Sequence, residues 1–128
     1  FFNDVMGEPF KYMRKQGMQL ASKMRFISAQ FMTYLSDNLW FQTAKKANDM
    51  AKLLADKASA VQKVKITQKV EANGVFAQIP KEIIEDLQKE YFFHVWDEEK
   101  GVVRWMTSFD TTEEDIDEFV KLLKEKIG

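Results

Sequence analysis

The chain has 128 residues, of which 45% are hydrophobic and 30% charged, and its formal net charge at pH 7 is −1. These values are typical of one globular domain, and the near-neutral charge argues against a nucleic-acid-binding protein, which needs a basic face. Without cysteine and with a single histidine, the chain offers no disulfide framework and no thiolate or histidine-based zinc site. No apolar run approaches the roughly 18 residues of a membrane span, and no signal peptide is visible, so we expect a cytoplasmic protein.

Residues 1–18 follow no regular pattern, and two glycines and a proline interrupt them: Gly7, Pro9 and Gly17. Because these residues favour turns and break helices, we expect an irregular segment. The chain opens with FFN and has no initial methionine. Two phenylalanines are an unusual natural start, so we interpret FFN as the end of a strand and the chain as the C-terminal piece of a longer protein.

Two helices are predicted over residues 19–61, where apolar residues recur every third or fourth position. The first helix has an apolar face made of Leu20, Met24, Ile27, Phe31 and Tyr34. The stretch SDN at 36–38 interrupts the pattern and supplies N-cap residues for the second helix. The second helix continues the same spacing, and its alanines predict a close approach to a neighbouring element. Its apolar face contains Trp40, Ala44, Ala47, Ala51, Leu54, Ala58 and Val61. These helices are also expected to pack partly on material outside the chain.

Residues 62–128 alternate between strand and helix patterns. In KVKITQKV, at 63–70, the apolar residues occupy every second position, which is typical of a half-buried strand. Asn73-Gly74 favours a tight turn or a bulge. A helix is expected to start at Pro80, with Ile83, Ile84, Leu87 and Tyr91 facing the core. Further strands are predicted at 74–79, 92–96 and 102–107.

The last two strands are separated by the loop 97–101, a length that favours a hairpin. Thr111 and Glu114 have the spacing of a capping box for the final helix. The inner face of that helix contains Ile116, Phe119, Val120, Leu123 and Ile127. The whole pattern predicts an α+β fold in which an antiparallel sheet of about four strands is covered on one face and preceded by two long helices.

Arg104 is the sharpest functional signal, because it places a permanent cation in an apolar strand. Strand alternation puts it on one face with Val102 and Met106. In a buried setting a guanidinium needs an anion, and its fork matches a carboxylate. One interpretation is structural: an ion pair with an acid of this chain, or an arginine on an open sheet face. The other is a clamp for the carboxylate of a small substrate.

A basic stretch between Tyr12 and Arg25 is a second candidate site. Its cations surround a glycine and a serine near a helix start, and such an arrangement can bind a phosphate. The alternative is that these cations are only solvated. They are Arg14, Lys15, Lys23 and Arg25. His94 is expected to pack in the core rather than act as a base. The acids of TTEED are expected to cap a helix, and four methionines to fill the core: Met13, Met18, Met24 and Met32.

Three stretches resemble the C-terminal part of bacterial low-specificity L-threonine aldolases. They are MRKQGMQLASKMRFISAQF, VEANGVFAQIP and FHVWDEEKGVVRWMTSFDTTEEDID. These aldolases are fold-type I pyridoxal-phosphate (PLP) enzymes of the β-eliminating lyase and threonine aldolase group. The resemblance covers nearly the whole chain, in order.

The resemblance implies a domain organisation and a chemistry. Residues 1–18 would be the end of the large domain and a linker, 19–61 the connecting helices and 62–128 the small C-terminal α+β domain. The family cleaves L-threonine and L-allo-threonine to glycine and acetaldehyde, and its members assemble as dimers or tetramers. The lysine that binds PLP is expected upstream of Phe1, so the chain alone is expected to be inactive and to bind no PLP covalently.

The resemblance also implies roles for three residues. Arg104, in RWMTSFD, resembles the arginine that binds the carboxylate of the amino-acid substrate. Lys15 and Arg25 resemble basic residues that reach the cofactor phosphate. No catalytic residue and no metal ligand is expected within the chain.

Two other functions stay open at this point. One is a different PLP enzyme of the same fold, a β-eliminating lyase or racemase acting on another amino acid. The other is a stand-alone α+β interaction module that binds a partner chain through the exposed face of its first long helix.

Overall fold

The computed structural model describes residues 4–18 and 21–128. It divides into two compact units, Phe1–Asp37 and Asn38–Gly128, and each is described here by itself. The expected strand end at FFN lies outside the described residues.

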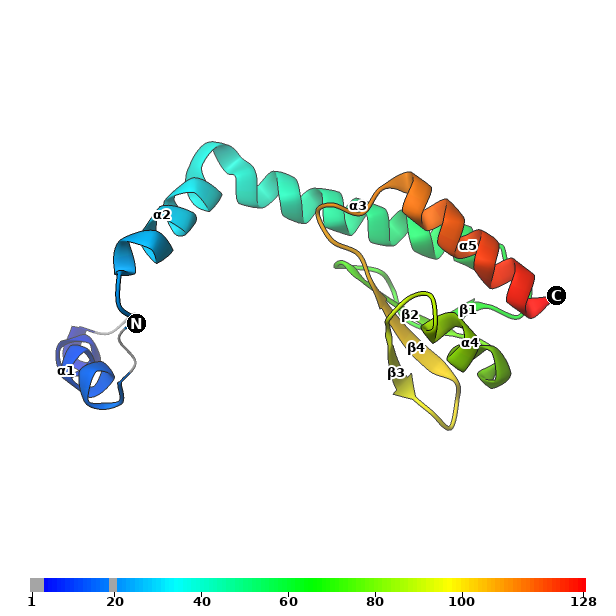
Figure 1. Cartoon of the computed structure of the whole chain (residues 1–128), viewed down its shortest axis with the longest axis horizontal. Helices are drawn as coiled ribbons and strands as arrows, with labels where there is room; N and C mark the ends of the chain where they lie inside the picture. Colours follow the sequence, from blue (N-terminus) through cyan, green and yellow to red (C-terminus); the bar gives the residue numbers. More distant parts are fainter. Residues whose placement is uncertain (1–3, 19–20) are drawn as a thin grey trace. The chain divides into compact units, whose positions relative to one another are not determined.

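The first unit contains α1 (Asp4–Gln16) and α2 (Met24–Leu35) (Figure 1). The prediction of an irregular segment over 1–18 is wrong, because α1 accommodates Pro9 within it. A proline removes only one helical hydrogen bond, and most residues that follow it are good helix formers. The helix ends where a glycine was expected to break it, at Gly17, whose N–H donates to the carbonyl of Met13 at 2.8 Å.

The first of the two predicted helices is confirmed as α2. It starts at Met24, and Leu20 lies outside the described residues. Lys23 precedes α2 in a left-handed conformation with φ 58°, which explains the later start. None of the residues of α2 is buried. The prediction that four methionines fill a core is therefore wrong; their exposed fractions are 63% for Met13, 88% for Met18, 44% for Met24 and 71% for Met32.

A short 3₁₀ turn, η1 (Ser36–Asn38), interrupts the helices at the predicted place. Asn38 is the N-cap of α3 (Leu39–Ser59), but its side chain makes no cap hydrogen bond. Its backbone is left-handed, with φ 58°, whereas a capping side chain normally belongs to a residue with extended backbone. The break is therefore confirmed, and the expected capping chemistry is wrong.

The second unit is built on a four-stranded antiparallel sheet with the order β1-β2-β4-β3. Its strands are β1 (Lys65–Ile66), β2 (Gly74–Gln78), β3 (His94–Asp97) and β4 (Val102–Met106). The predicted strand 63–70 is reduced to two residues, since Lys63 has a left-handed backbone with φ 65°. The pairing ends at Thr67, whose N–H donates to the carbonyl of Phe76 at 2.9 Å.

Asn73-Gly74 forms neither a tight turn nor a bulge, because Gly74 is the first residue of β2. Asn73 instead extends the pairing of β2 with β4. Its side-chain Nδ2 donates to the carbonyl of Thr107 at 2.8 Å, and the N–H of Thr107 donates to the carbonyl of Asn73 at 3.0 Å.

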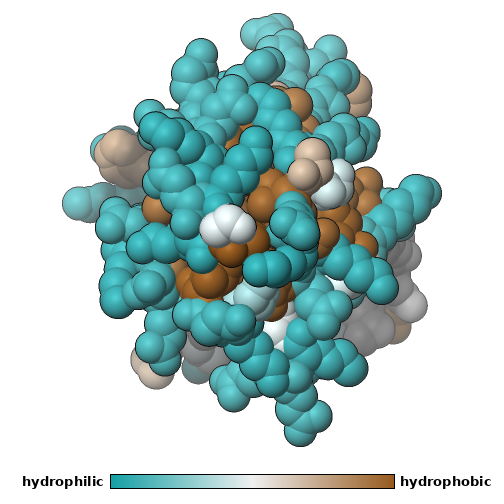
Figure 2. All heavy atoms as spheres, turned by 90° about the vertical axis from the view of Figure 1, so that its right-hand side faces the viewer, coloured by the Kyte–Doolittle hydropathy of each residue, from teal (hydrophilic) through white to brown (hydrophobic). Residues whose placement is uncertain are grey.

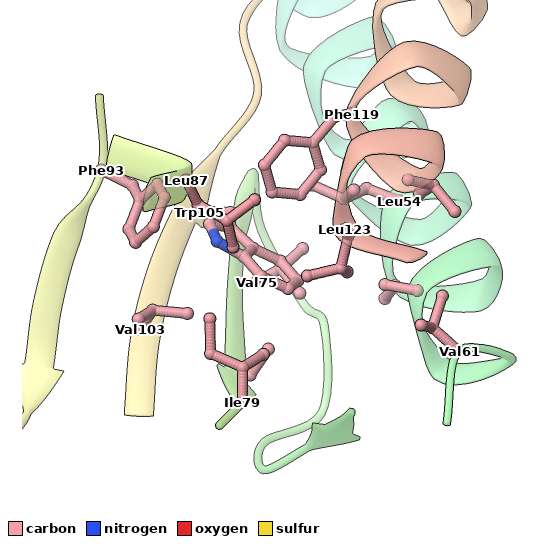
Figure 3. Packing of buried hydrophobic residues seen from close by; sticks show 14 of the residues in the cluster. Leu54, Val61, Val75, Ile79, Leu87, Phe93, Val103, Trp105, Phe119 and Leu123 are labelled. Carbon is pink, nitrogen blue, oxygen red and sulfur yellow. The ribbon is translucent and has the colours of Figure 1, made fainter. Parts of the chain in front are cut away.

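Helices α3 and α5 (Glu113–Ile127) cover one face of the sheet, which confirms the α+β fold (Figure 1). Figure 3 shows Leu54 of α3 with Phe119 and Leu123 of α5 on the side of the sheet where Val75 and Trp105 point. The alanine face of α3 is buried only from Ala47 onward, and Trp40 remains 45% exposed. Seen from the end where α5 finishes, most of the surface is hydrophilic (Figure 2).

Between β2 and β3 the chain forms η2 (Lys81–Ile83) and α4 (Ile84–Gln88). Pro80 precedes the first turn as its N-cap rather than occupying the first helical position. Ile83, Ile84 and Leu87 are buried, as predicted, and Tyr91 is half-buried.

The predicted β3–β4 hairpin is confirmed, and its loop ends at Gly101 with φ +66°. A Cβ on this residue would lie 2.7 Å from the carbonyl oxygen of Ile79, so only glycine fits.

The capping box of α5 lies one residue later than predicted, at Thr112 and Asp115. Thr111 Oγ1 instead accepts a hydrogen bond from the N–H of Ser108 at 2.9 Å. The expectation that acids of TTEED cap the helix is nevertheless confirmed for Asp115.

Candidate functional site

Arg104 lies on the open face of the sheet, opposite the helices. Within the sheet it pairs directly with Phe76 of β2 on one side and with His94 of β3 on the other. Residues that are directly opposite each other point to the same side, so these three side chains share the open face. Their neighbours Val103 and Trp105 point the other way and are buried in the core.

The guanidinium of Arg104 has no acid partner among the described residues. None of the ion pairs there involves Arg104, and its Nε is buried without a hydrogen-bond partner. An ion pair with an acid of the described residues is therefore not the reason for this arginine. The second structural interpretation, an arginine on an open sheet face, describes its position but leaves a buried donor unsatisfied, which is rare in proteins.

Two aromatic residues border Arg104. Its guanidinium carbon Cζ lies 5.5 Å from the ring centroid of Trp96, within the range of a cation–π contact. The ring of Phe76 meets that of Trp96 edge to face, with centroids 5.1 Å apart. Neither residue was a candidate from the sequence, because their proximity to Arg104 depends on the register of three strands.

His94 is exposed, so the prediction that it packs in the core is wrong. The strand alternation that buries Val103 and Trp105 turns the residue opposite Arg104 towards solvent. The imidazole contacts the ring of Phe92 edge to face, with centroids 5.3 Å apart.

Lys15 and Arg25 belong to the first unit, whereas Arg104 belongs to the second. Both are exposed. Lys15 lies in the last turn of α1, where a cation also complements the helix dipole. Arg25 lies in the first turn of α2, where the dipole disfavours a cation, and its Cζ is 5.2 Å from the ring of Phe26. A role for either residue in binding phosphate stays a prediction.

Other kinds of site receive no support from residues 4–18 and 21–128. No group of three or more histidine, aspartate or glutamate side chains in these ranges is placed to hold a metal ion. None of the helices in the same ranges is both long and apolar enough to cross a membrane.

The chain is similar over its whole length to known threonine aldolases, although no protein-family model matches it. It is 40% identical over 129 aligned positions to the low specificity L-threonine aldolase of Pseudomonas aeruginosa, covering 100% of this chain and 37% of that protein. It is also 40% identical over 113 positions to the enzyme of the same name from a Pseudomonas species, covering 88% of this chain and 33% of that protein.

A solved structure agrees with these similarities. The threonine aldolase of Leishmania major matches with a TM-score of 0.80 and 25% identity, over 92% of this chain and 35% of that one. The chain thus spans about a third of the length of the relatives it matches. The resemblance to low-specificity L-threonine aldolases that the sequence motifs predict is confirmed.

Proposed function

We propose that this chain, which is similar from end to end to threonine aldolases, is the C-terminal part of a PLP-dependent enzyme of that kind. The complete enzyme cleaves L-threonine and L-allo-threonine to glycine and acetaldehyde. In this proposal residues 1–18 end the large domain, 19–61 form the connecting helices and 62–128 form the small domain. The enzyme is a cytoplasmic homo-oligomer.

The observation that carries the proposal is the half-buried Arg104, which has no acid partner in the described part of the chain. An amino-acid substrate brings a carboxylate, the anion that a guanidinium fork matches best. Each hydrogen bond to such a charged group contributes about 1.5–3 kcal/mol. Arg104 therefore binds the substrate carboxylate and fixes the orientation of the substrate.

The chemistry of cleavage belongs to the cofactor. Bound PLP supplies the electron sink for the carbanion that remains when the Cα–Cβ bond of the substrate breaks. The exposed cations Lys15 and Arg25 suit a phosphate group, and we assign them to the cofactor phosphate. The lysine that binds PLP covalently is assigned to the part of the protein that precedes this chain.

Substitution of Arg104 by lysine in the complete protein tests the clamp. Lysine keeps the charge but loses the bidentate geometry, so we expect the KM for L-threonine to rise about 10- to 100-fold. The yellow colour of bound PLP is expected to persist, because Arg104 contacts the substrate rather than the cofactor.

Lys124→Arg is the control, since it makes the reverse exchange at an exposed position in the last turn of α5, outside the proposed site. An unchanged KM in Arg104→Lys would show that the clamp assignment is wrong. A colourless complete protein that does not cleave threonine would contradict the proposed function as a whole. Cleavage or racemisation of a different amino acid in its place would identify another PLP enzyme of the same fold.

A further inference from the structure

The side chain of Arg104 needs help to hold one orientation. An arginine has a long side chain with several rotatable bonds, and a clamp works only if the guanidinium is already in place. Within the described residues no acid fixes it, and its Nε makes no hydrogen bond. Whatever orients this guanidinium must therefore act mainly through packing and the cation–π contact.

The rings of Phe76 and Trp96 meet above the strand that carries Arg104. Phe76 belongs to β2 and Trp96 to β3, and these two strands flank β4. Strands on either side of a third are about 9.5 Å apart, twice the spacing of neighbouring strands. Since the ring centroids are only 5.1 Å apart, the two side chains together must reach across β4 on its open face.

An irregularity in the sheet brings Trp96 to this position. Val95 pairs with Val103, but Asp97 pairs with Val102, so the register shifts by one residue at Trp96. Such a β-bulge redirects the side chain of the extra residue. Here the indole lies with its ring centroid 5.5 Å from Cζ of Arg104.

We infer that Trp96, supported by Phe76, is a positioning residue that orients the guanidinium of Arg104 towards a carboxylate ligand. This inference rests on the proposed function, because it takes the substrate carboxylate as the ligand of Arg104. The indole face supplies a cation–π contact, and the edge-to-face contact with Phe76 limits rotation of the indole.

Packing of the core does not explain this arrangement. Trp96 is 57% exposed, whereas the tryptophan of the core, Trp105, is 4% exposed. Much of the Trp96 side chain therefore faces solvent, and removing it is expected to affect ligand binding more than folding.

The test measures binding of substrate and of acetate, a carboxylate probe, by the complete enzyme. In Trp96→Leu we expect the KM for L-threonine and the inhibition constant of acetate to rise about three- to tenfold, with kcat within about twofold. Trp96→Phe, which retains an aromatic face, is expected to restore most of the binding. Phe92→Leu is the matched control, because Phe92 is 86% exposed and its ring contacts His94.

A double-mutant cycle separates positioning from a general structural effect. If Trp96 acts through Arg104, Trp96→Leu has little further effect on acetate binding in an Arg104→Lys background. An equal effect in both backgrounds would overturn the inference. Phe76→Leu provides a second test if Trp96→Leu does not fold. It is expected to weaken acetate binding, but less than Arg104→Lys does. Unchanged acetate binding in Phe76→Leu would also overturn the inference.

The same experiments distinguish the inference from the proposed function. Weaker acetate binding in Arg104→Lys together with normal binding in Trp96→Leu would refute the positioning role and leave the clamp intact. Normal acetate binding in Arg104→Lys would refute both.

Discussion

Helices α2 and α5 have similar lengths and are both rich in apolar residues, but they bury them differently. In α5, four apolar residues face the core and are nearly inaccessible: Ile116, Phe119, Val120 and Leu123. In α2 no residue is buried, and Phe26, Phe31 and Leu35 are 57%, 62% and 62% exposed. The spacing of apolar residues thus predicts which side chains share a helix face, but not whether another element covers that face.

The two helices also begin differently. The N-cap of α5, Thr112, has an extended backbone and forms a reciprocal capping box with Asp115. The N-cap of α2, Lys23, has a left-handed backbone and makes no side-chain cap hydrogen bond. A capping box and a buried apolar face therefore stabilise α5, whereas α2 gains little stability from its N-cap or from burial of its side chains.

A matched pair of leucine substitutions gives the largest expected difference between the two regions. Leu123 is 0% exposed, so Leu123→Ala creates a cavity and is expected to lower the free energy of unfolding by about 2–5 kcal/mol. Leu35→Ala, in α2, is expected to change it by less than about 0.5 kcal/mol, because that side chain is already in contact with solvent. Urea denaturation monitored by circular dichroism measures both values. Equal losses would show that α2 is covered as fully as α5.

A substitution at the helix starts gives a smaller difference. Thr112→Ala removes the capping oxygen of α5 and is expected to lower the free energy of unfolding by about 1 kcal/mol. Lys23→Ala, at the corresponding position of α2, is expected to have little effect, since the side chain of Lys23 makes no cap hydrogen bond. Urea denaturation again measures both. If Glu114→Ala lowered the free energy of unfolding as much as Thr112→Ala does, the capping box would instead involve Glu114, as the sequence pattern predicts.

Local patterns in the sequence were sufficient to predict most of the second unit. The strands predicted at 74–79, 92–96 and 102–107 correspond to β2, β3 and β4, and helical spacing identified the inner face of α5. These predictions succeed because each depends on neighbours within one element or one hairpin. Errors occurred where two local signals competed, as in α1, where the helix-forming residues after Pro9 outweigh the proline.

The candidate site was only partly predictable for the same reason. Arg104 was identified because a cation in an apolar strand is visible in the sequence. The rings beside it were not, since Phe76 and Trp96 approach Arg104 only through the pairing of β2, β4 and β3 and the register shift at Trp96. Burial in the first unit was also mispredicted, because helical spacing says nothing about the surroundings of α2.

The smallest expected effect concerns the acid sensitivity that the capping box gives to the second unit. Hydrogen bonds from the backbone N–H and the hydroxyl of Thr112 lower the pKa of Asp115 below its ordinary value. The folded state therefore binds a proton at this carboxylate more weakly than the unfolded state does. It follows that Asp115 stabilises the fold above its unfolded pKa of about 3.9, and that this contribution is lost as the pH falls through the lowered folded value.

Asp115→Asn removes this titration, so the variant is expected to lose less stability than the parent protein between about pH 5 and pH 2. Urea denaturation at a series of pH values measures the difference in slope. Glu114→Gln is the matched control, because the capping box is formed by Thr112 and Asp115. Other carboxylates with lowered pKa values, such as Asp86 and Asp97, keep part of the acid sensitivity in every variant. An unchanged slope in Asp115→Asn would mean that the capping carboxylate is not coupled to folding, and that the start of α5 is no better stabilised by charge than the start of α2.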